Sequence, residues 1–290
     1  MSQVAELQRP KSLEAGAATR LRAWLTCSNA LARLLLCAYR WVDPVLDVRR
    51  LAAVPRYVSF LQDVVRYRRL PGAERLTWLD TYPCLHDKTK TSCFDRHYFY
   101  QDAWAFRRIV ESGTAAHVDV GSRVDFVGML AAVTKVTFID LRPLEVNWQN
   151  LGSRAGTILA LPLPGNAVAS LSCLHVAEHI GLGRYGDALD PQGTLRATRE
   201  LARVLAPGGN LYFSVPVGKP RVCFNAHRIH SPEQILDYFD ELELAEFSAV
   251  GDDRVFYLRA DLRMFAQSQY ACGLFWFRKP TRTGGAEGNE

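Results

Sequence analysis

The chain has 290 residues, of which 48% are hydrophobic and 22% are charged, and its formal net charge is +5. This is an ordinary globular composition, and the length is enough for one large domain with an appendage or for two small domains. The seven cysteines are odd in number and scattered, with no C-x-x-C pair. That pattern argues against a disulfide scaffold or a cysteine-based zinc ribbon and favours a reducing compartment.

Residues 1–20 are polar and small and have no apolar core, so we expect a disordered tail rather than a secretory signal. The most apolar early stretch, WLTCSNALARLLLCAYRWV, contains Arg33 and Arg40 and falls short of the apolar length that a membrane span needs. We therefore expect a soluble protein of the cytoplasm.

Residues 21–90 are predicted to form a helical N-terminal extension. Apolar residues recur there at steps of three and four, and Pro44 and Pro55 divide the region into two or three helices. Basic residues outnumber acidic ones up to residue 75, and the arginines are crowded: Arg49, Arg50, Arg56, Arg66, Arg68 and Arg69. Such a flank is either a solvated helix face or a surface for phosphates, acidic glycans or a membrane.

Residues 91–280 are predicted to form one α/β domain, and residues 281–290 a disordered tail. A helix over 97–112 precedes an alternation of strands and helices, which is typical of a doubly wound and mostly parallel sheet. The predicted strands are 115–120, 135–141, 157–163, 168–176, 210–217, 244–250 and 270–280. The last two, joined by a longer loop, suit an antiparallel edge. Ser231, Pro232 and Gln234 predict a capped helix start.

Ligands of such sheets bind at the carboxyl ends of the strands. There, Asp119 and Gly121 follow the first predicted strand, and Asp140 ends the second, nineteen residues after Gly121. A glycine allows the tight turn that brings a ligand to the backbone, and a carboxylate at that distance can accept both hydroxyls of a ribose. The pair predicts a nucleoside ligand.

Four segments resemble the ordered motifs of class I S-adenosylmethionine-dependent methyltransferases: HVDVGS, VTFIDL, LPLPGNAVASLSCLHVAEHI and RELARVLAPGGNLYFSVP. The resemblance covers about residues 115–247 and is strongest to the branch that reads L-P-F-x-D-x-S-F-D followed by H-x-L-E-H. The segment YPCLHDKTKTSCFDRHYFYQDAWA is also similar to a poorly characterised methyltransferase-like family often found beside polysaccharide-synthesis functions. These resemblances imply a seven-stranded, Rossmann-like methyltransferase sheet that binds S-adenosyl-L-methionine.

The resemblance also implies roles for individual positions. Cofactor contacts would come from the turn after the first strand (Asp119, Gly121 and Ser122) and from the carboxylate that would bind the ribose with the residue after it (Asp140 and Leu141). Leu161 and Pro162 would run past the adenine, and His175 would lie at the end of the fourth strand. The chain departs from the pattern at Arg123 and Asp125, where glycines are usual, and at Thr157, where an acid that binds the adenine is common. A degenerate binding module without catalysis is therefore an alternative.

His175, Glu178 and His179 also spell H-x-x-E-H, the pattern of inverted zinc metalloproteases. A zinc site needs both histidines on one helix face, together with a third ligand. Here an apolar, β-branched run carries a strand into His175, and Gly181 and Gly183 follow closely. We expect no metal site, and expect Glu178 and His179 to brace the strand end.

The segment VCFNAHRIHSP follows the fifth predicted strand, where the methyltransferase fold has its acceptor contacts. A hydroxyl acceptor needs a base, so His227, His230 and His175 are the catalytic candidates. Asn225, Arg228 and Tyr100 are candidates for contact with the substrate. Tyr98 and Gln101 are candidates for lining the entrance to the cofactor site. The predicted function is O-methylation of a glycan or related small metabolite. Methylation of nucleic acid, suggested by the basic extension, is the less favoured alternative.

Overall fold

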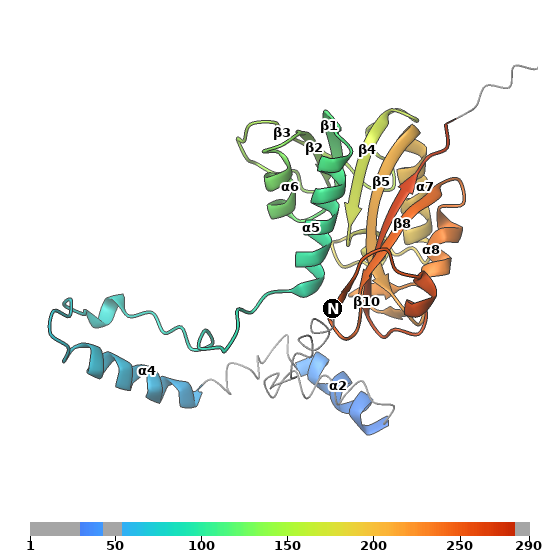
Figure 1. The fold of residues 1–290 in the computed structure, drawn as a ribbon. Helices are drawn as coiled ribbons and strands as arrows, with labels where there is room; N and C mark the ends of the chain where they lie inside the picture. Colours follow the sequence, from blue (N-terminus) through green and yellow to red (C-terminus); the bar gives the residue numbers. More distant parts are fainter. Residues whose placement is uncertain (1–29, 43–53, 282–290) are drawn as a thin grey trace, which may run out of the picture. The chain divides into compact units, whose positions relative to one another are not determined.

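The computed structural model describes residues 30–42 and 54–281, and the chain divides into two compact units, Met1–Cys93 and Phe94–Glu290. In the first unit the described elements are helices α2 (Ala30–Val42) and α4 (Val54–Tyr67) and a single turn, η1 (Trp78–Asp80) (Figure 1). The tails that we expected to be disordered, 1–20 and 281–290, lie outside the described residues except for residue 281. Pro44, which was expected to separate two helices, also lies outside them. Among the described helices, none combines the length and the apolar character needed to cross a bilayer.

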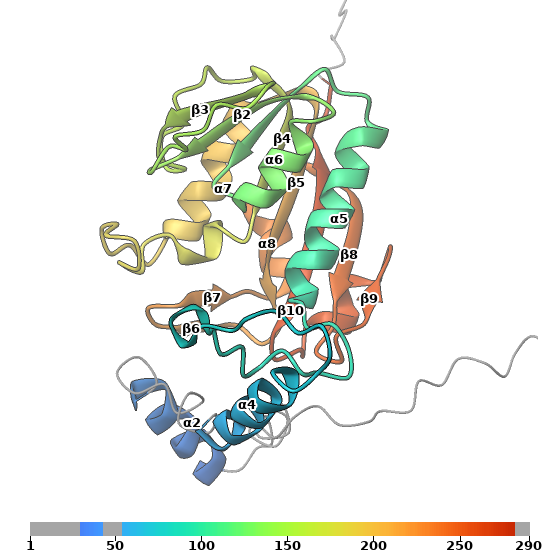
Figure 2. The ribbon, with the colours of Figure 1, turned by 90° about the vertical axis from the view of Figure 1, so that its left-hand side faces the viewer.

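The second unit is built on one eight-stranded sheet in the order β3-β2-β1-β4-β5-β10-β8-β9. Its strands are β1 (Ala116–Val120), β2 (Lys135–Asp140), β3 (Leu151–Ala155), β4 (Val168–Leu174), β5 (Leu205–Val217), β8 (Glu243–Val250), β9 (Phe256–Tyr257) and β10 (Ala271–Arg278). Strands β1 to β5 are parallel, and β10 runs antiparallel to both of its neighbours. The predicted doubly wound, mostly parallel, Rossmann-like sheet is confirmed (Figure 2).

The third strand is not where the sequence predicted it. Residues 151–155, which lie outside the predicted strands, pair with β2 at the sheet edge, while residues 157–163 form a turn with a bridge between Thr157 and Ala160. The prediction failed because an edge strand is largely exposed and so lacks an apolar pattern. The more apolar segment after it lines a cavity instead of joining the sheet.

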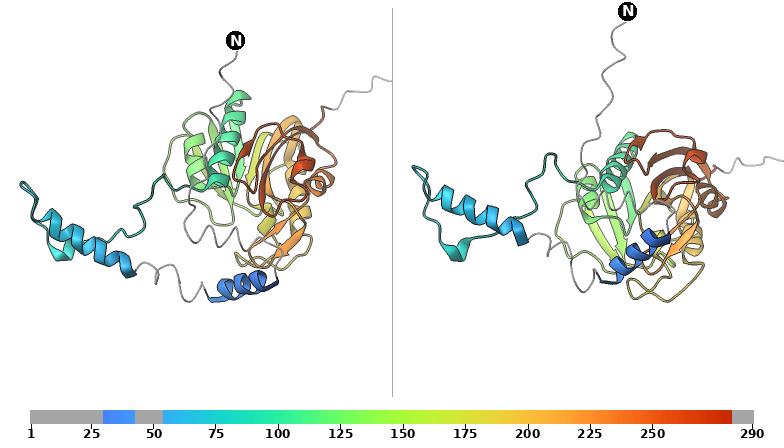
Figure 3. Two further views of the ribbon diagram at one scale, coloured as in Figure 1. Left: turned by 60° about the horizontal axis from the view of Figure 1, so that its bottom comes forward. Right: turned by 90° about the horizontal axis from the view of Figure 1, so that it is seen from below.

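Two helical layers cover the sheet (Figures 1 and 3). Helices α5 (Arg96–Glu111) and α6 (Val124–Leu130) bury their apolar stripes on one face, and α7 (Gly193–Val204) and α8 (Pro232–Tyr238) on the other. The predicted start of α8 is confirmed, because the Ser231 hydroxyl accepts a hydrogen bond from the Gln234 backbone N–H at 3.1 Å. A small hairpin, β6 (Arg221–Cys223) and β7 (His227–Ile229), follows β5.

Helix α5 is held to the sheet by a buried ion pair. The Arg108 guanidinium donates to Glu246 of β8 at 2.7 Å, and the Trp104 indole N–H donates to the same carboxylate at 2.8 Å. At its other end Asp95 caps the helix by accepting the backbone N–H groups of His97 and Tyr98. The rigid helix thereby brings Tyr98 to the carboxyl edge of the parallel strands.

Candidate functional site

Two neighbouring cavities open at the carboxyl ends of β1, β2 and β4. The larger has a volume of about 420 Å³ and the smaller about 170 Å³. Their shared wall is made by Gly121, His175, His179 and Tyr185. A cleft of two compartments at this edge is where an open α/β sheet binds its ligands.

The turn after β1 brings its backbone to both cavities. Gly121 has φ +69°, and a Cβ there would lie 3.1 Å from Val176, so the position requires glycine. Beneath the turn, Asp119 is fully buried and accepts the Ser122 backbone N–H at 3.0 Å. Ser122 lines the larger cavity, whereas Asp119 lines neither, so Asp119 shapes the turn from below.

A buried polar chain supports Asp119. Its second oxygen accepts the Ser172 hydroxyl, and that hydroxyl lies 2.8 Å from Nε2 of His117, whose Nδ1 lies 2.8 Å from the Ser170 hydroxyl. Burial lowers the pKa of His117 to about 3 and raises that of Asp119 to about 6. His117 is therefore neutral at pH 7, and Nε2 is its donor because Ser172 gives its own proton to Asp119.

The smaller cavity contains the predicted ribose site. Asp140 and Leu141 line it, and the Asp140 Oδ1 atom accepts the Arg142 backbone N–H at 2.8 Å. The Oδ2 atom would lie 3.5 Å from a Cβ on Gly121, so it faces the glycine turn. The carboxylate therefore offers an oxygen where the turn admits a ligand.

Leu161 and Pro162, the predicted adenine contacts, lie outside the two cavities. Leu161 is buried with its backbone N–H bonded to Glu200, Pro162 is exposed, and neither lines a cavity. The wall is made instead by residues 156–159, including Thr157 and Leu159. This shift has the same origin as the misplaced third strand.

Arg123, which replaces the usual glycine, leaves the cavity open. Its guanidinium stacks on the Tyr98 ring at 4.8 Å and pairs with Asp125 at 2.9 Å. These contacts hold the Arg123 side chain at the edge of the larger cavity, which it lines. The two departures from the resembled pattern, Arg123 and Asp125, thus form an ion pair with each other and leave the space beside Gly121 unfilled.

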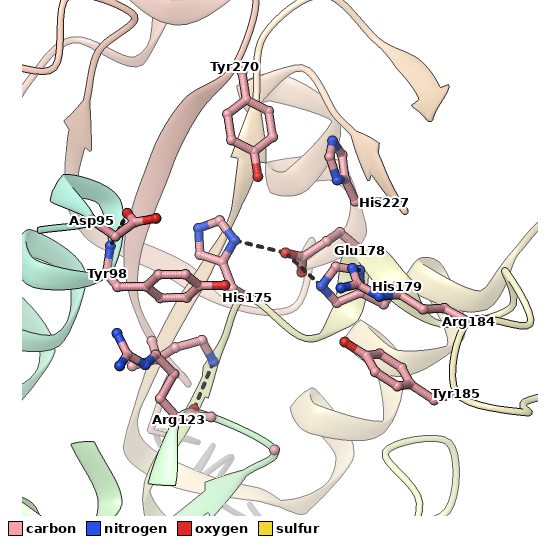
Figure 4. Close-up of a pocket in the computed structure, with 13 residues that line it drawn as sticks. Asp95, Tyr98, Arg123, His175, Glu178, His179, Arg184, Tyr185, His227 and Tyr270 are labelled. Carbon is pink, nitrogen blue, oxygen red and sulfur yellow. Dashed lines mark hydrogen bonds and ion pairs between the residues drawn. The ribbon is translucent and has the colours of Figure 1, made fainter. Parts of the chain in front are cut away.

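His175 is the buried centre of the shared wall. It follows β4 with φ +56°, a left-handed conformation that is uncommon outside glycine. Its Nδ1 lies 2.9 Å from a carboxylate oxygen of Glu178 (Figure 4). Its Nε2 lies 3.2 Å from the Cys272 Sγ. Because both ring nitrogens are engaged, His175 orients the wall and has no nitrogen left to accept a proton from a substrate.

The zinc pattern is explained by the same geometry. Glu178 and His179 belong to a three-residue turn, η2 (Ala177–His179), so His175 and His179 share no helix face. The His179 Nδ1 lies 2.6 Å from the Ala226 carbonyl oxygen and braces the β6–β7 hairpin. Within residues 30–42 and 54–281, no group of three or more His, Cys, Asp or Glu residues could hold a metal ion.

Of the candidates in the segment VCFNAHRIHSP, His227 alone lines the larger cavity. Arg228 is buried and donates to the carbonyl oxygens of Ile180 and Asp190, so it holds the loop before α7. His230 is buried with its Nδ1 3.1 Å from Gln234, and Asn225 is exposed. These three brace or flank the hairpin.

Two of the residues expected from α5 also lie away from the cavities. Tyr100 stacks on Phe256 at 5.1 Å, and Gln101 is buried and accepts the Ser214 hydroxyl at 2.6 Å. Tyr98 lines the larger cavity as expected. Of the α5 residues, Tyr98 alone lines the larger cavity, while Tyr100 and Gln101 pack against the sheet side of the domain.

Sequence reasoning missed Tyr270 and Tyr185. Tyr270 precedes β10 and packs against the His227 ring at 5.0 Å, with its hydroxyl directed into the larger cavity (Figure 4). Tyr185 lies between the guanidinium groups of Arg142 and Arg184, at 5.2 and 5.1 Å. The available signal for Tyr185 was the glycine-rich GLGRYG after η2, which predicts a tight loop at a strand's carboxyl end.

Two of the histidines that line the larger cavity, His175 and His227, have pKa values shifted in opposite directions. Burial lowers the pKa of His227 to about 4, so it is neutral at pH 7. Burial also disfavours the charge on His175, but Cys272 and the Glu178 carboxylate outweigh it and raise its pKa well above 6.5. In ¹H NMR, the His175 ring should stay charged and the His227 ring neutral from pH 5 to 6.5. A His227 signal that titrates near pH 6.5, assigned with His227→Asn, would contradict this.

Comparison with solved structures gives several similar folds. The match to the cyclase SpnF covers 67% of this chain and 85% of the SpnF chain, with 16% identity and a TM-score of 0.49. The N-methyltransferase NodS from Bradyrhizobium japonicum, in complex with S-adenosyl-L-homocysteine, covers 76% and 97%, with 17% identity and a TM-score of 0.47. Geranyl diphosphate C-methyltransferase from Streptomyces coelicolor covers 63% and 80%, with 15% identity and a TM-score of 0.46. The assignment of a doubly wound α/β fold rests on the sheet order itself.

Residues 166–266 match a family model described as "Caenorhabditis protein of unknown function, DUF268". The match begins just before β4 and ends after η3 (Leu262–Phe265), so it includes His175, Glu178 and His227. No curated protein matches the chain.

Proposed function

We propose that the chain is an S-adenosylmethionine-dependent methyltransferase that acts on an oxygen of a small polar acceptor, a glycan or a related metabolite. The observation that carries the proposal is the position of Asp140. Its carboxylate faces the glycine turn at Gly121 in the smaller of two joined cavities. A ribose held there directs the rest of a nucleoside cofactor across Gly121 toward the larger cavity.

The residues present fit this cofactor. Arg123 leaves the larger cavity open, and its guanidinium stays at the rim, where a carboxylate of the methionine part would meet a positive charge. The wall of residues 156–159 would pack along the adenine. Bound S-adenosylmethionine supplies an electrophilic methyl group, and the protein's task is to align the acceptor with it.

The acceptor would lie among Tyr98, His227 and Tyr270 in the larger cavity. Their polar atoms suit a hydroxyl acceptor. His227 is uncharged at pH 7, so its ring can accept a hydrogen bond from the acceptor and take its proton as the bond to carbon forms. His227 is therefore our candidate for the general base, in place of His175 and His230.

Calorimetry with S-adenosyl-L-homocysteine tests the cofactor part of the proposal. We expect one site with a dissociation constant in the micromolar range, and no heat from NAD, which shares the ribose and adenine but has a pyrophosphate in place of the amino acid. An absence of binding up to about 1 mM, equivalent to about 4 kcal/mol, would overturn the proposal and favour the binding module without catalysis. Transfer of a labelled methyl group to a panel of glycans, small polyols and RNA then tests the acceptor class.

A further inference from the structure

Helix α4 of the N-terminal unit presents a continuous apolar stripe. Val54, Tyr57, Val58, Leu61 and Val65 follow the steps of three and four residues that put side chains on one helix face, within about 100° of one another. Each of them is between 45% and 59% exposed. Val64, on the neighbouring face, is the buried residue of the helix. The stripe is about 17 Å long at the rise of an α-helix.

The opposite side of α4 already has its contacts. The Arg56 guanidinium donates to the Leu85 carbonyl oxygen at 3.1 Å and lies 2.8 Å from His86. Asp63 pairs with Lys88. Residues 85–88 therefore pack along the polar side of the helix, and among the described residues 54–93 the apolar stripe stays exposed.

The charges around the stripe are mostly positive. Residues 54–75 contain five arginines and two acids. Both acids are engaged, Asp63 with Lys88 and Glu74 with the Tyr67 hydroxyl. Arg66, Arg68 and Arg69 at the end of α4 are exposed. A negatively charged surface would complement this end of the helix.

Further exposed apolar side chains follow in the same unit. Trp78, Leu79 and Tyr82 are 57%, 94% and 85% exposed. Tryptophan and tyrosine are the residues that anchor proteins at the boundary between bilayer and water. A helix with an apolar stripe, low overall hydrophobicity and arginines on its polar side is typical of one that lies in the plane of a membrane.

We propose that α4 docks the protein on an anionic lipid bilayer, with the Val54–Val65 stripe in the interface and Arg66, Arg68 and Arg69 against the headgroups. Positive charge would attract the helix to the surface, and burial of the stripe would retain it. Either contribution alone gives weak and reversible binding. The docking would be selective for membranes that contain anionic lipids, and it does not depend on the proposed methyl transfer.

Vesicle flotation of the full chain tests this. The wild type should float with vesicles of phosphatidylcholine and phosphatidylserine but not with phosphatidylcholine alone. Leu61→Asp should weaken binding by at least roughly 50-fold, since it removes an apolar contact and adds a buried charge. Ser59→Asp adds the same charge on the polar side and should weaken binding only about 5-fold. The triple variant Arg66→Gln, Arg68→Gln, Arg69→Gln should weaken it about 100-fold.

Three outcomes would overturn the proposal. The wild type could fail to float with either vesicle, or Leu61→Asp and Ser59→Asp could lose affinity equally. The wild type could also self-associate in gel filtration without binding vesicles, with Leu61→Asp restoring a smaller species. In that case a second copy of the chain would cover the stripe. Leu61 and Ser59 are both exposed, so unchanged thermal unfolding shows that the variants fold.

Discussion

Glu178→Gln should lower the free energy of unfolding by about 3 kcal/mol at pH 6, the low end of what breaking a buried ion pair costs. Glu178 is fully buried, 2.9 Å from His175, and Glu178→Gln leaves the imidazolium without a charged partner. Burial would then lower the pKa of His175, so the ring would lose its proton. The ring and the wall that it forms would lose their fixed orientation.

The size of this effect should depend on pH. Burial favours the neutral acid of Glu178, but His175 lowers its pKa below 4.5, so its contribution to stability is complete above that pH and is lost as pH falls through the lowered pKa. The pKa of His175 is raised above 6.5, so its contribution is complete below that pH and is lost as pH rises through the raised pKa. The difference between wild type and variant should therefore be largest from about pH 4.5 to 6.5.

Urea unfolding at several pH values measures this difference. Glu241→Gln is the matched control, because it makes the same change at an exposed position and should alter stability by less than about 0.5 kcal/mol. A loss in Glu178→Gln no larger than in the control would show that the buried pair contributes nothing to stability.

Asp140→Ala should weaken the binding of S-adenosyl-L-homocysteine roughly 100-fold. A carboxylate that accepts two ribose hydroxyls contributes two charge-assisted hydrogen bonds, each of about 1.5–3 kcal/mol, and partial exposure reduces that sum. Stability should change little, because the one hydrogen bond recorded for this carboxylate is with the Arg142 backbone N–H.

Calorimetry with folded variants checks the expectation. Asp240→Ala, which removes an exposed carboxylate outside both cavities, is the control and should bind like the wild type. Equal affinity of Asp140→Ala and the wild type would mean that the ribose, if bound, lies elsewhere. This outcome differs from a failure of the wild type to bind, which would overturn the proposed function itself.

The sequence predicted those elements whose hydrophobic pattern or residue spacing is distinctive. Strand β2 contains the β-branched and aromatic run VTFI, and α5 has a regular stripe, so both were found from local information. Strand β3 was missed because an exposed edge strand has no such run. The first turn could be located because Gly121 and Asp140 lie at the ends of strands that the sequence defines well.

The acceptor side of the site could not be found in the same way. His227 and His230 belong to or follow the short strand β7, and successive side chains of a strand point to opposite faces. Deciding which one faces the cavity requires the register of the β6–β7 hairpin, which local sequence does not fix. Tyr270 reaches the site because β10 is antiparallel, so that its beginning, not its end, lies at the carboxyl edge of the parallel strands.

The shared wall has a thermodynamic consequence. Gly121, His175, His179 and Tyr185 line both cavities, so occupants of the two compartments would contact the same residues. An occupant that moved the His175 ring would break its contacts with Glu178 or Cys272 and would change the wall that the other occupant meets. Binding in one cavity would therefore change affinity in the other, and by the same factor in either order of addition.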